Sequence, residues 1–452
     1  MKRLSAPLDV QIELTEKCNQ KCFHCYNYWR YSEEIGKNEL NTQDFLAVVK
    51  KLVTAGINSV TLTGGEPFLR PGLLFSILEY CDKNNIKASI NSNATLIKKH
   101  DAIKMRDLGV THVLVSLLGT EKTHNTITNS KTFKKACDGI IALINNKVKV
   151  SINMAVSKLN FCELFNVSKI AKDLGVSAFC ATPVVPSHES NKNYLLSGEE
   201  CKQVLRTLLK IKDELKLNID TLEPIARCLF NEEEEGEFVN FFGNRICSAA
   251  VTTCAISPRG TVRPCIHADV EFGNLLHENF FDIWEKMGLW ASPDILPNGC
   301  KSCKAVVICE GGCRMSAKLV SGCYDGKDMY MKGPITSMER VLKLPLPLHF
   351  KEAEEETINF QETDVFNFNP SVVLRKEDFG GVVYGNNKVD FLTNKGLDFL
   401  LSLKSKGIFS IESIKEENEL EADKISLLFN KLYKNKIIMK GGDKGECRNF
   451  TR

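Results

Sequence analysis

The alternation of strand-like and helix-like segments in the first half of the chain constrains the fold more than any other feature. Strand-like runs occur at residues 8–15, 59–65, 87–93, 112–118, 149–157 and 178–185. Segments with helical periodicity lie between them, and several end in Gly or Asn, as helix C-termini do. Strands joined by helix-length crossovers form a parallel sheet with right-handed connections. The pattern predicts an α/β domain whose sheet is either open or curled toward a barrel.

Three cysteines lie on one short loop after the first strand-like run. In EKCNQKCFHCYN, Cys18, Cys22 and Cys25 have the spacing C-x3-C-x2-C. Functional loops follow the carboxyl ends of strands in such sheets. Three thiolates can hold a 4Fe-4S cluster and leave one iron open to an outside ligand. A Cys3His zinc site that includes His24 is the alternative, although the adjacent His24 and Cys25 are poorly placed to share one tetrahedral ion.

Composition narrows the class of protein. A chain of 452 residues with 43% hydrophobic content predicts two or three domains. Eighteen cysteines and no export signal favour metal ligation over disulfides, so we expect a cytoplasmic protein. A net charge of +3 does not indicate a nucleic-acid partner, and no uncharged apolar stretch reaches the length of a membrane span. We therefore expect neither nucleic acid nor membrane as a partner.

A second group of eight cysteines lies between residues 247 and 323. Cys247, Gly260 and Cys265 have the spacing C-x12-G-x4-C, and a C-x2-C-x5-C-x3-C run begins at Cys300. Eight thiols suffice for two fully ligated 4Fe-4S clusters. The other seven cysteines are scattered, and we expect ordinary packing from them: Cys81, Cys137, Cys162, Cys180, Cys201, Cys228 and Cys447.

The first cysteine motif resembles the signature of the radical SAM superfamily, C-x3-C-x-(aromatic)-C, with His24 at the aromatic position near the adenine. In TLTGGEPFLR, the residues Gly64, Gly65, Glu66 and Pro67 match the GGEP motif of that superfamily. The resemblance implies that this turn receives the methionyl amino group of S-adenosylmethionine (SAM). The fit is chemical as well, because glycines admit close backbone approach and a carboxylate pairs with an ammonium.

Further SAM contacts are implied by the resemblance alone. Asn93 lies in NSNAT, where relatives carry TNGT, and Ser116 in VSLLGT matches a ribose-contacting serine. Asn153, on the next strand-like run, is a further candidate, and ordinary strand polarity is the alternative for both Ser116 and Asn153. Two positions depart from the superfamily pattern: Leu118 replaces its usual Asp, and Thr128 replaces the Arg of its HDxxR pattern, which His124 and Asn125 begin.

The second cysteine group resembles the SPASM extension of radical SAM maturases. The resemblance implies two auxiliary 4Fe-4S clusters, and so three in all. It assigns Cys247, Cys254, Cys265 and Cys313 to the first, and Cys300, Cys303, Cys309 and Cys323 to the second. If Cys254 is instead a buried core thiol, the first auxiliary cluster has an open iron able to bind a substrate thiolate.

The rest of the chain predicts a linker and a small module. Residues 336–365 are charged and interrupted by Pro, as linkers are. Residues 366–445 have an α+β pattern with a hairpin turn at Asn386-Asn387 and three helices near 394–406, 410–416 and 421–435, which predicts a winged-helix-like module. DNA binding is the alternative role, but the acidic segment IESIKEENELEADK matches phosphate tracking poorly. The module resembles the PqqD-like RiPP recognition element, which binds leader peptides.

These resemblances imply a fold and a function. Residues 1–225 form a partial (β/α)6 TIM-like barrel, and residues 226–335 form the SPASM domain. SAM is cleaved to a 5'-deoxyadenosyl radical, which abstracts hydrogen from a ribosomally made precursor peptide. The oxidative outcome is a thioether or carbon-carbon crosslink, and a flavodoxin- or ferredoxin-like protein donates the electron. The alternatives are tetrapyrrole-type decarboxylation, a sulfatase-type maturase, and an iron-sulfur redox sensor that binds DNA. No residue is named as catalytic acid or base.

Overall fold

The chain divides into two compact units, Met1–His349 and Phe350–Arg452. A computed structural model describes residues 3–27, 32–186, 188–242, 246–343, 358–385, 388–418 and 422–441. The predicted turn at Asn386-Asn387, residue Cys447 and residues 344–357 of the predicted linker lie outside this range.

The first unit is built around one ten-stranded sheet. Its strand order is β10-β9-β8-β1-β2-β3-β4-β5-β6-β7, and the pairs from β8 through β1 to β7 are parallel. All six predicted strand segments are present, which confirms the predicted α/β partial barrel. The strands are β1 Asp9–Glu13, β2 Ser59–Thr63, β3 Lys87–Ser92, β4 His112–Ser116, β5 Val150–Val156, β6 Ala178–Pro183 and β7 Asn218–Asp220.

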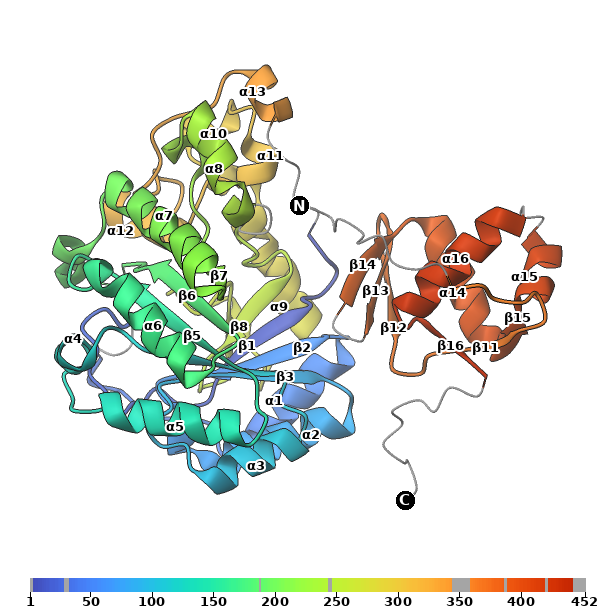
Figure 1. The fold of residues 1–452 in the computed structure, drawn as a ribbon, viewed down its shortest axis with the longest axis horizontal. Helices are drawn as coiled ribbons and strands as arrows, with labels where there is room; N and C mark the ends of the chain where they lie inside the picture. Colours follow the sequence, from blue (N-terminus) through green and yellow to red (C-terminus); the bar gives the residue numbers. More distant parts are fainter. Residues whose placement is uncertain are drawn as a thin grey trace. The chain divides into compact units, whose positions relative to one another are not determined.

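Helices lie along the outside of this curved sheet (Figure 1). They are α1 Thr42–Thr54, α2 Pro71–Lys83, α3 Lys99–Asp107, α4 Glu121–Ile127, α5 Phe133–Asn145, α6 Leu164–Leu174 and α7 Gly198–Leu215. In α1, the Asn41 side chain accepts from the Asp44 backbone N–H and so caps the helix. Its buried residues Phe45, Val48, Val49 and Leu52 recur every three or four positions, which is the stripe a helix needs to cover a sheet.

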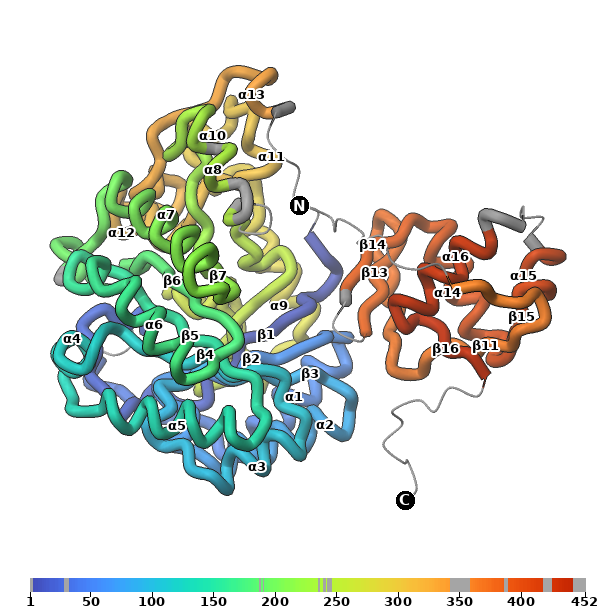
Figure 2. Tube along the Cα trace, in the orientation of Figure 1, coloured from blue at the N-terminus to red at the C-terminus, as the bar shows by residue number. Residues whose placement is uncertain are grey.

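The sheet continues into the cysteine-rich region. Strand β8 (Thr253–Ile256) pairs parallel to β1, with Val10 opposite Cys254. Strands β9 (Thr261–Arg263) and β10 (Gly273–Asn274) then extend it in antiparallel fashion. Figure 2 shows strands β1 to β7 following one another along the chain, and Figure 1 shows where β8 then returns beside β1. This return brings the second cysteine group back toward the barrel.

Short elements make up the remainder of the first unit. The α-helices are α8 Glu232–Phe242, α9 Phe280–Lys286, α10 Asn298–Lys301, α11 Val306–Cys309, α12 Arg314–Ser321 and α13 Met338–Lys343. The 3-10 turns are η2 Pro67–Leu69, η3 Phe161–Glu163, η4 Glu189–Tyr194, η5 Arg227–Leu229, η6 Met287–Ala291 and η7 Pro293–Ile295. One hydrophobic core runs from the barrel strands into this region and includes Trp284.

The second unit has its own core, around Phe366 and Phe429. Its two sheets are antiparallel and three-stranded, ordered β15-β11-β16 and β12-β13-β14. The three predicted helices are all present, which supports the expected winged-helix-like pattern. The elements are β11 Val365–Phe368, β12 Val373–Glu377, β13 Gly380–Gly385, β14 Lys388–Leu392, α14 Asn394–Lys406, β15 Ile408–Ser410, α15 Ile411–Asn418, α16 Ala422–Lys434 and β16 Ile438–Lys440.

Within the described ranges, none of the helices combines the length and the apolar character that crossing a membrane would require.

Candidate active site

The loop that carries Cys18, Cys22 and Cys25, called here the Cys loop, leaves the carboxyl end of β1. Cys18 is exposed, and the other two thiols are half-buried. The loop is fastened to the end of α4, because Lys21 N–H donates to the Thr128 carbonyl at 2.9 Å. The side-chain amide of the buried Gln20 also donates a hydrogen bond to the Thr132 hydroxyl at 2.9 Å. The three predicted thiols therefore lie on a loop that is held by hydrogen bonds to the end of α4 and to the residues that follow it.

The GGEP turn packs directly against the Cys loop. Gly65 N–H donates to the Thr15 carbonyl at 2.6 Å, and Glu66 N–H donates to the Lys17 carbonyl at 2.9 Å. A Cβ added at Gly65 would lie 2.0 Å from the Lys17 oxygen. Gly64 has φ +136°, a conformation that L side chains rarely adopt. Both glycines are thus required by the close approach of the two backbones, and their contact with SAM remains a prediction.

Glu66 and Asn93 connect the turn to the first thiol. The Glu66 carboxylate is buried and accepts from Ser92 Oγ at 2.8 Å and from Asn93 N–H at 2.9 Å. Burial raises the pKa of Glu66 to about 7, although these hydrogen bonds oppose the shift. The Asn93 side-chain amide lies 3.9 Å from Cys18 Sγ. Pro67 follows as the first residue of η2, whose N-cap is Glu66.

Two further predicted SAM contacts lie side by side. Ser116 ends β4 and is paired in register with Asn153 on β5. Asn153 Oδ1 accepts from the Thr182 hydroxyl at 2.8 Å. His24, at the predicted adenine-facing position, lies edge-on to Phe23 with ring centroids 5.2 Å apart. The SAM contacts of these three residues remain predictions.

His124 has a structural role. It is fully buried, and its Nδ1 accepts from the Leu118 N–H at 3.2 Å. Burial lowers the pKa of His124 to about 4, so the ring is neutral near pH 7. Asn125 accepts from two backbone N–H groups at the start of α5, Thr132 at 2.9 Å and Phe133 at 3.0 Å. These two residues therefore shape the loop between β4 and α5.

Three thiols of the first predicted auxiliary set are neighbours. Burial is the main cause that raises the pKa of Cys265 to about 12, and the neighbouring Cys247 adds to this shift. Burial also raises the pKa of Cys313, with further contributions from Glu223, Asp328 and Cys247. Glu223 contributes to the raised pKa of all three thiols, so its carboxylate lies among them.

Cys254, the fourth predicted member, lies elsewhere. It is 1% exposed on β8 and belongs to the hydrophobic core. Burial raises its pKa, and the neighbour that adds to this shift is Asp9 rather than another thiol. Its surroundings are therefore those of the core-thiol alternative, in which one iron of the first auxiliary cluster is open.

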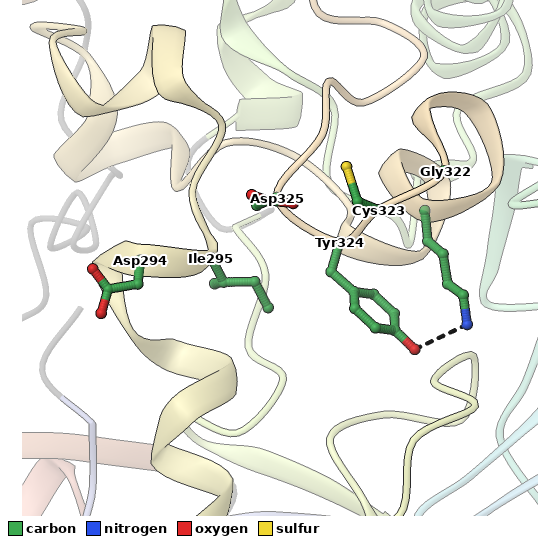
Figure 3. A pocket seen from close by; sticks show the side chains of 7 residues that line it. Asp294, Ile295, Gly322, Cys323, Tyr324 and Asp325 are labelled. Atoms are coloured by element: carbon green, nitrogen blue, oxygen red, sulfur yellow. Dashed lines mark hydrogen bonds between the residues drawn. The ribbon is translucent and has the colours of Figure 1, made fainter.

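In the second predicted auxiliary set, three thiols are also neighbours and the fourth has different surroundings. Burial, and then Cys309, Cys303 and Cys228, raise the pKa of Cys300 to about 11. Cys323 is instead exposed and lines a surface hollow of 430 Å³, between Gly322 and Tyr324 (Figure 3). The structure therefore brings Cys300, Cys303 and Cys309 together and places Cys323 on the surface.

The described thiols do not form a site for a single metal ion. Over the ranges that the structure describes, no three His, Cys, Asp or Glu side chains converge within reach of one metal ion. The gathered groups are thiols, which are the ligands that iron-sulfur clusters use. The cluster assignments of all eleven cysteines remain predictions.

An ion pair that sequence reasoning missed lies inside the barrel. Glu13 at the end of β1 and Arg263 at the end of β9 are fully buried, and the Arg263 guanidinium donates to Glu13 Oε2. Burial raises the pKa of Glu13 to about 7, while Arg263 opposes the shift. Glu13 lies near the end of the strand-like run LDVQIELT. A carboxylate at that position is the feature of the sequence that could have indicated a buried ion pair.

A second missed group lies between the Cys loop and the first auxiliary set. The rings of Tyr26 and His267 have centroids 4.9 Å apart, and His267 Nδ1 lies 3.7 Å from Glu223 Oε1. Tyr26 immediately follows Cys25, and Glu223 neighbours the auxiliary thiols. This group therefore links the Cys loop to the neighbourhood of the first auxiliary thiols.

Comparison with known families agrees with this arrangement. Residues 12–167 match the Radical SAM superfamily. Residues 247–304 match SPASM, the iron-sulfur cluster-binding domain. The chain therefore carries a radical SAM domain and a SPASM domain. The second unit, Phe350–Arg452, lies beyond both matches.

Three relatives of this radical SAM enzyme are informative. It is similar to the AdoMet-dependent heme synthase of Methanosarcina barkeri, with 26% identity over 340 residues that cover 72% of this chain and 96% of the relative. Its fold resembles Streptococcus suis SuiB bound to the precursor peptide SuiA, with TM-score 0.59, 20% identity, and coverage of 72% and 75%. It also resembles anSMEcpe with bound AdoMet, with TM-score 0.58, 20% identity, and coverage of 72% and 90%. The curated and structural relatives thus act on or bind different kinds of molecule.

Proposed function

We propose that this radical SAM enzyme modifies a ribosomally made precursor peptide, forming a thioether or carbon-carbon crosslink. The observation that supports this proposal is the second unit, a separate α+β module with exposed strand edges of the kind that capture extended peptides. A small-molecule enzyme would need no such surface. A flavodoxin- or ferredoxin-like protein in the cytoplasm would supply the electron.

The residues of the barrel would bind and orient SAM. Cys18, Cys22 and Cys25 would hold a 4Fe-4S cluster, and Glu66 would pair with the methionyl ammonium while Gly64 and Gly65 let it approach the backbone. When bound, the cluster and SAM supply a 5'-deoxyadenosyl radical that abstracts a hydrogen atom from the substrate. The buried Glu66 and the packing of the GGEP turn against the Cys loop would help to exclude water from this chemistry.

The sheet β12-β13-β14 would bind the leader segment of the peptide. β12 and β14 are its two edges, since each pairs with β13 alone among the described strands. Each edge exposes one large apolar side chain, Val373 at 40% on β12 and Phe391 at 53% on β14. An added strand would gain backbone hydrogen bonds along an edge, and such side chains would supply specificity.

Two surface variants test this proposal and identify the edge. Phe391→Ser and Val373→Ser each remove one exposed apolar side chain, so neither should unfold the module. The assay combines iron-loaded protein, SAM, a reductant and candidate precursor peptides, and mass spectrometry follows the loss of paired hydrogen atoms. We expect one variant to lose peptide modification while both still release 5'-deoxyadenosine. Full modification by both variants would contradict peptide capture at these edges.

A second candidate function has a specific observation in its favour. The identity to an AdoMet-dependent heme synthase extends over 96% of that relative, which favours a tetrapyrrole substrate. In that case the second unit would serve assembly only. Turnover of an iron porphyrin carboxylate, with release of carbon dioxide, would establish this alternative. Iron loading without any SAM cleavage would instead favour the redox sensor.

A further inference from the structure

The thiols Cys300, Cys303 and Cys309 form a compact group, called here the second thiol set. They are carried by α10, α11 and the turn between them, and Cys303 N–H donates to the Cys300 carbonyl at 3.1 Å. Two backbone N–H groups point at their sulfurs: that of Ile335 lies 3.2 Å from Cys303 Sγ, and that of Arg227 lies 3.4 Å from Cys309 Sγ. Donors of this kind stabilise thiolates that ligate a cluster.

The second of these donors brings Cys228 to the second thiol set. Cys228 is the middle residue of η5, and the N–H of the preceding residue, Arg227, contacts Cys309 Sγ. Arg227 and Leu229 are buried, at 3% and 2% exposed, so η5 is anchored on both sides of the half-buried Cys228. Cys228 also lies close enough to Cys300 and Cys309 to interact with both electrostatically. Two members of the set therefore have Cys228 as an electrostatic neighbour.

Cys323 has different surroundings. It follows α12 and its left-handed C-cap Gly322, and its Sγ lies 3.8 Å from the Ser321 carbonyl. Asp325 is the first of the groups that raise its pKa. Figure 3 shows Cys323 among the residues that line the hollow, together with Asp294, Ile295 and Tyr324, and no other predicted cluster thiol lines that hollow. The neighbours Ser321, Tyr324 and Asp325 therefore all come from the chain segment that carries Cys323 itself.

The chain beyond Cys323 does return to the second thiol set, but it brings no thiol. Met331 Sδ lies 3.8 Å from Cys300 Sγ, and Lys304 N–H pairs with the Ile335 carbonyl at 2.9 Å. A thioether is neutral and a weaker ligand for iron in a cluster than a thiolate. The returning segment therefore places the apolar side chain of Met331, and no thiol, next to Cys300.

We infer that Cys228 is the fourth thiolate of the second auxiliary cluster, with Cys300, Cys303 and Cys309, and that Cys323 is not a ligand. Ligation would release the Cys228 thiol proton and form one iron-sulfur bond, with no change of oxidation state. The segment after β7 would then complete the cluster in place of Cys323, which the SPASM resemblance assigns to it. This inference rests on the proposed iron-sulfur chemistry and is independent of the substrate.

Thiol protection in the wild-type chain tests the inference without any variant. Anaerobically reconstituted protein is alkylated with iodoacetamide before and after removal of iron by a chelator, and each cysteine is quantified by mass spectrometry. We expect Cys228 to be protected with iron and labelled without it, as Cys303 and Cys309 are. Cys323 and the exposed Cys162 should be labelled in both states. Labelling of Cys228 in the iron-loaded protein, or iron-dependent protection of Cys323, would overturn the inference.

Paired variants give an independent test. In a C18A/C22A/C25A background, two auxiliary clusters account for about eight irons. Adding Cys228→Ala should lower this toward about four, or change the electron paramagnetic resonance spectrum of the reduced protein, whereas adding Cys323→Ala should change neither. An unaltered iron content and spectrum with Cys228→Ala would refute the assignment. Wild-type protein that takes up zinc or no iron would refute the proposed enzymatic function as well, so the two failures are distinguishable.

Discussion

The backbone N–H of Glu66 donates a hydrogen bond of 2.9 Å to the carbonyl oxygen of Lys17, the residue before Cys18. A second bond, from Gly65 N–H to Thr15, lies beside it at 2.6 Å. The GGEP turn and the Cys loop therefore form one structural element, although more than forty residues separate them in the sequence. Any change that separates the two backbones should disturb the cluster site and the SAM site together.

Gly65→Ala should disrupt this element. The added methyl group would lie 2.0 Å from the Lys17 oxygen, and backbone cannot move aside as a flexible side chain can. We expect a loss of roughly 1–3 kcal/mol in the free energy of unfolding and at least about a tenfold loss of SAM cleavage. Gly72→Ala is the matched control, because nothing lies within 4 Å of its added Cβ. Thermal melts and 5'-deoxyadenosine release measure both effects, and equal behaviour of the two variants would contradict the argument.

SAM binding should depend on the ionisation of Glu66. Burial raises the pKa of Glu66 to about 7, so the carboxyl is largely neutral below that pH and charged above it. An ammonium pairs with the charged form, and SAM affinity should therefore increase as the pH rises through about 7. In the protein without SAM, burial favours the neutral form of Glu66, so this carboxyl contributes most to the free energy of unfolding at low pH. That contribution is lost as the pH rises from the ordinary pKa of glutamate through about 7. Equilibrium binding of SAM at about pH 6 and about pH 8 measures this dependence.

Glu66→Gln is the control for that prediction. The amide keeps the size of the side chain but cannot ionise, so SAM should bind weakly and with little dependence on pH over this range. A binding curve for Glu66→Gln with the same slope as wild type would assign the pH dependence to another group.

The buried Glu13–Arg263 pair should be needed for stability. Arg263→Met leaves a buried carboxylate without its partner, which costs roughly 3–5 kcal/mol, and the cost should increase with pH as Glu13 ionises. Glu13→Gln combined with Arg263→Met should recover much of the loss, because no unpaired charge is then buried. Urea denaturation at two pH values measures these differences. Arg106→Ala, which removes an exposed ion pair with Asp107, should be nearly neutral, and a comparable cost there would weaken the argument.

Cys254→Ala should leave the iron content of the reconstituted protein unchanged, since this thiol lies in the core beside Asp9. Cys265→Ala, in contrast, should lose iron, because Cys265 has Cys247 as a neighbour. Iron and sulfide analysis of both variants, with far-ultraviolet circular dichroism to verify folding, distinguishes them. Loss of about four irons with Cys254→Ala would instead make it a cluster ligand, as the SPASM resemblance implies.

Much of the fold could be predicted from local sequence. Each of the strands β1 to β6 lies within a predicted run, and α14 begins and ends at the expected residues, 394 and 406. Periodicity succeeds here because buried strands and amphipathic helices carry their pattern within a few consecutive residues. The Cys loop and the GGEP turn were also identifiable, since both follow strands in a parallel sheet and so meet at the same edge.

The sequence by itself therefore determined the order of elements, the kinds of ligand and their spacing within each loop. Only the tertiary structure decided which thiols meet. Arg227 and Cys309 are 82 residues apart, and their contact depends on how η5 and the cysteine-rich segment pack after β8 has returned to β1. Spacing predicts Cys254 and Cys323 as ligands and Cys228 as a scattered thiol. The iron measurements proposed above test these assignments, because spacing along a chain does not encode the register of contacts between distant segments. That register is set by the packing of the whole core, which is a property of no single segment.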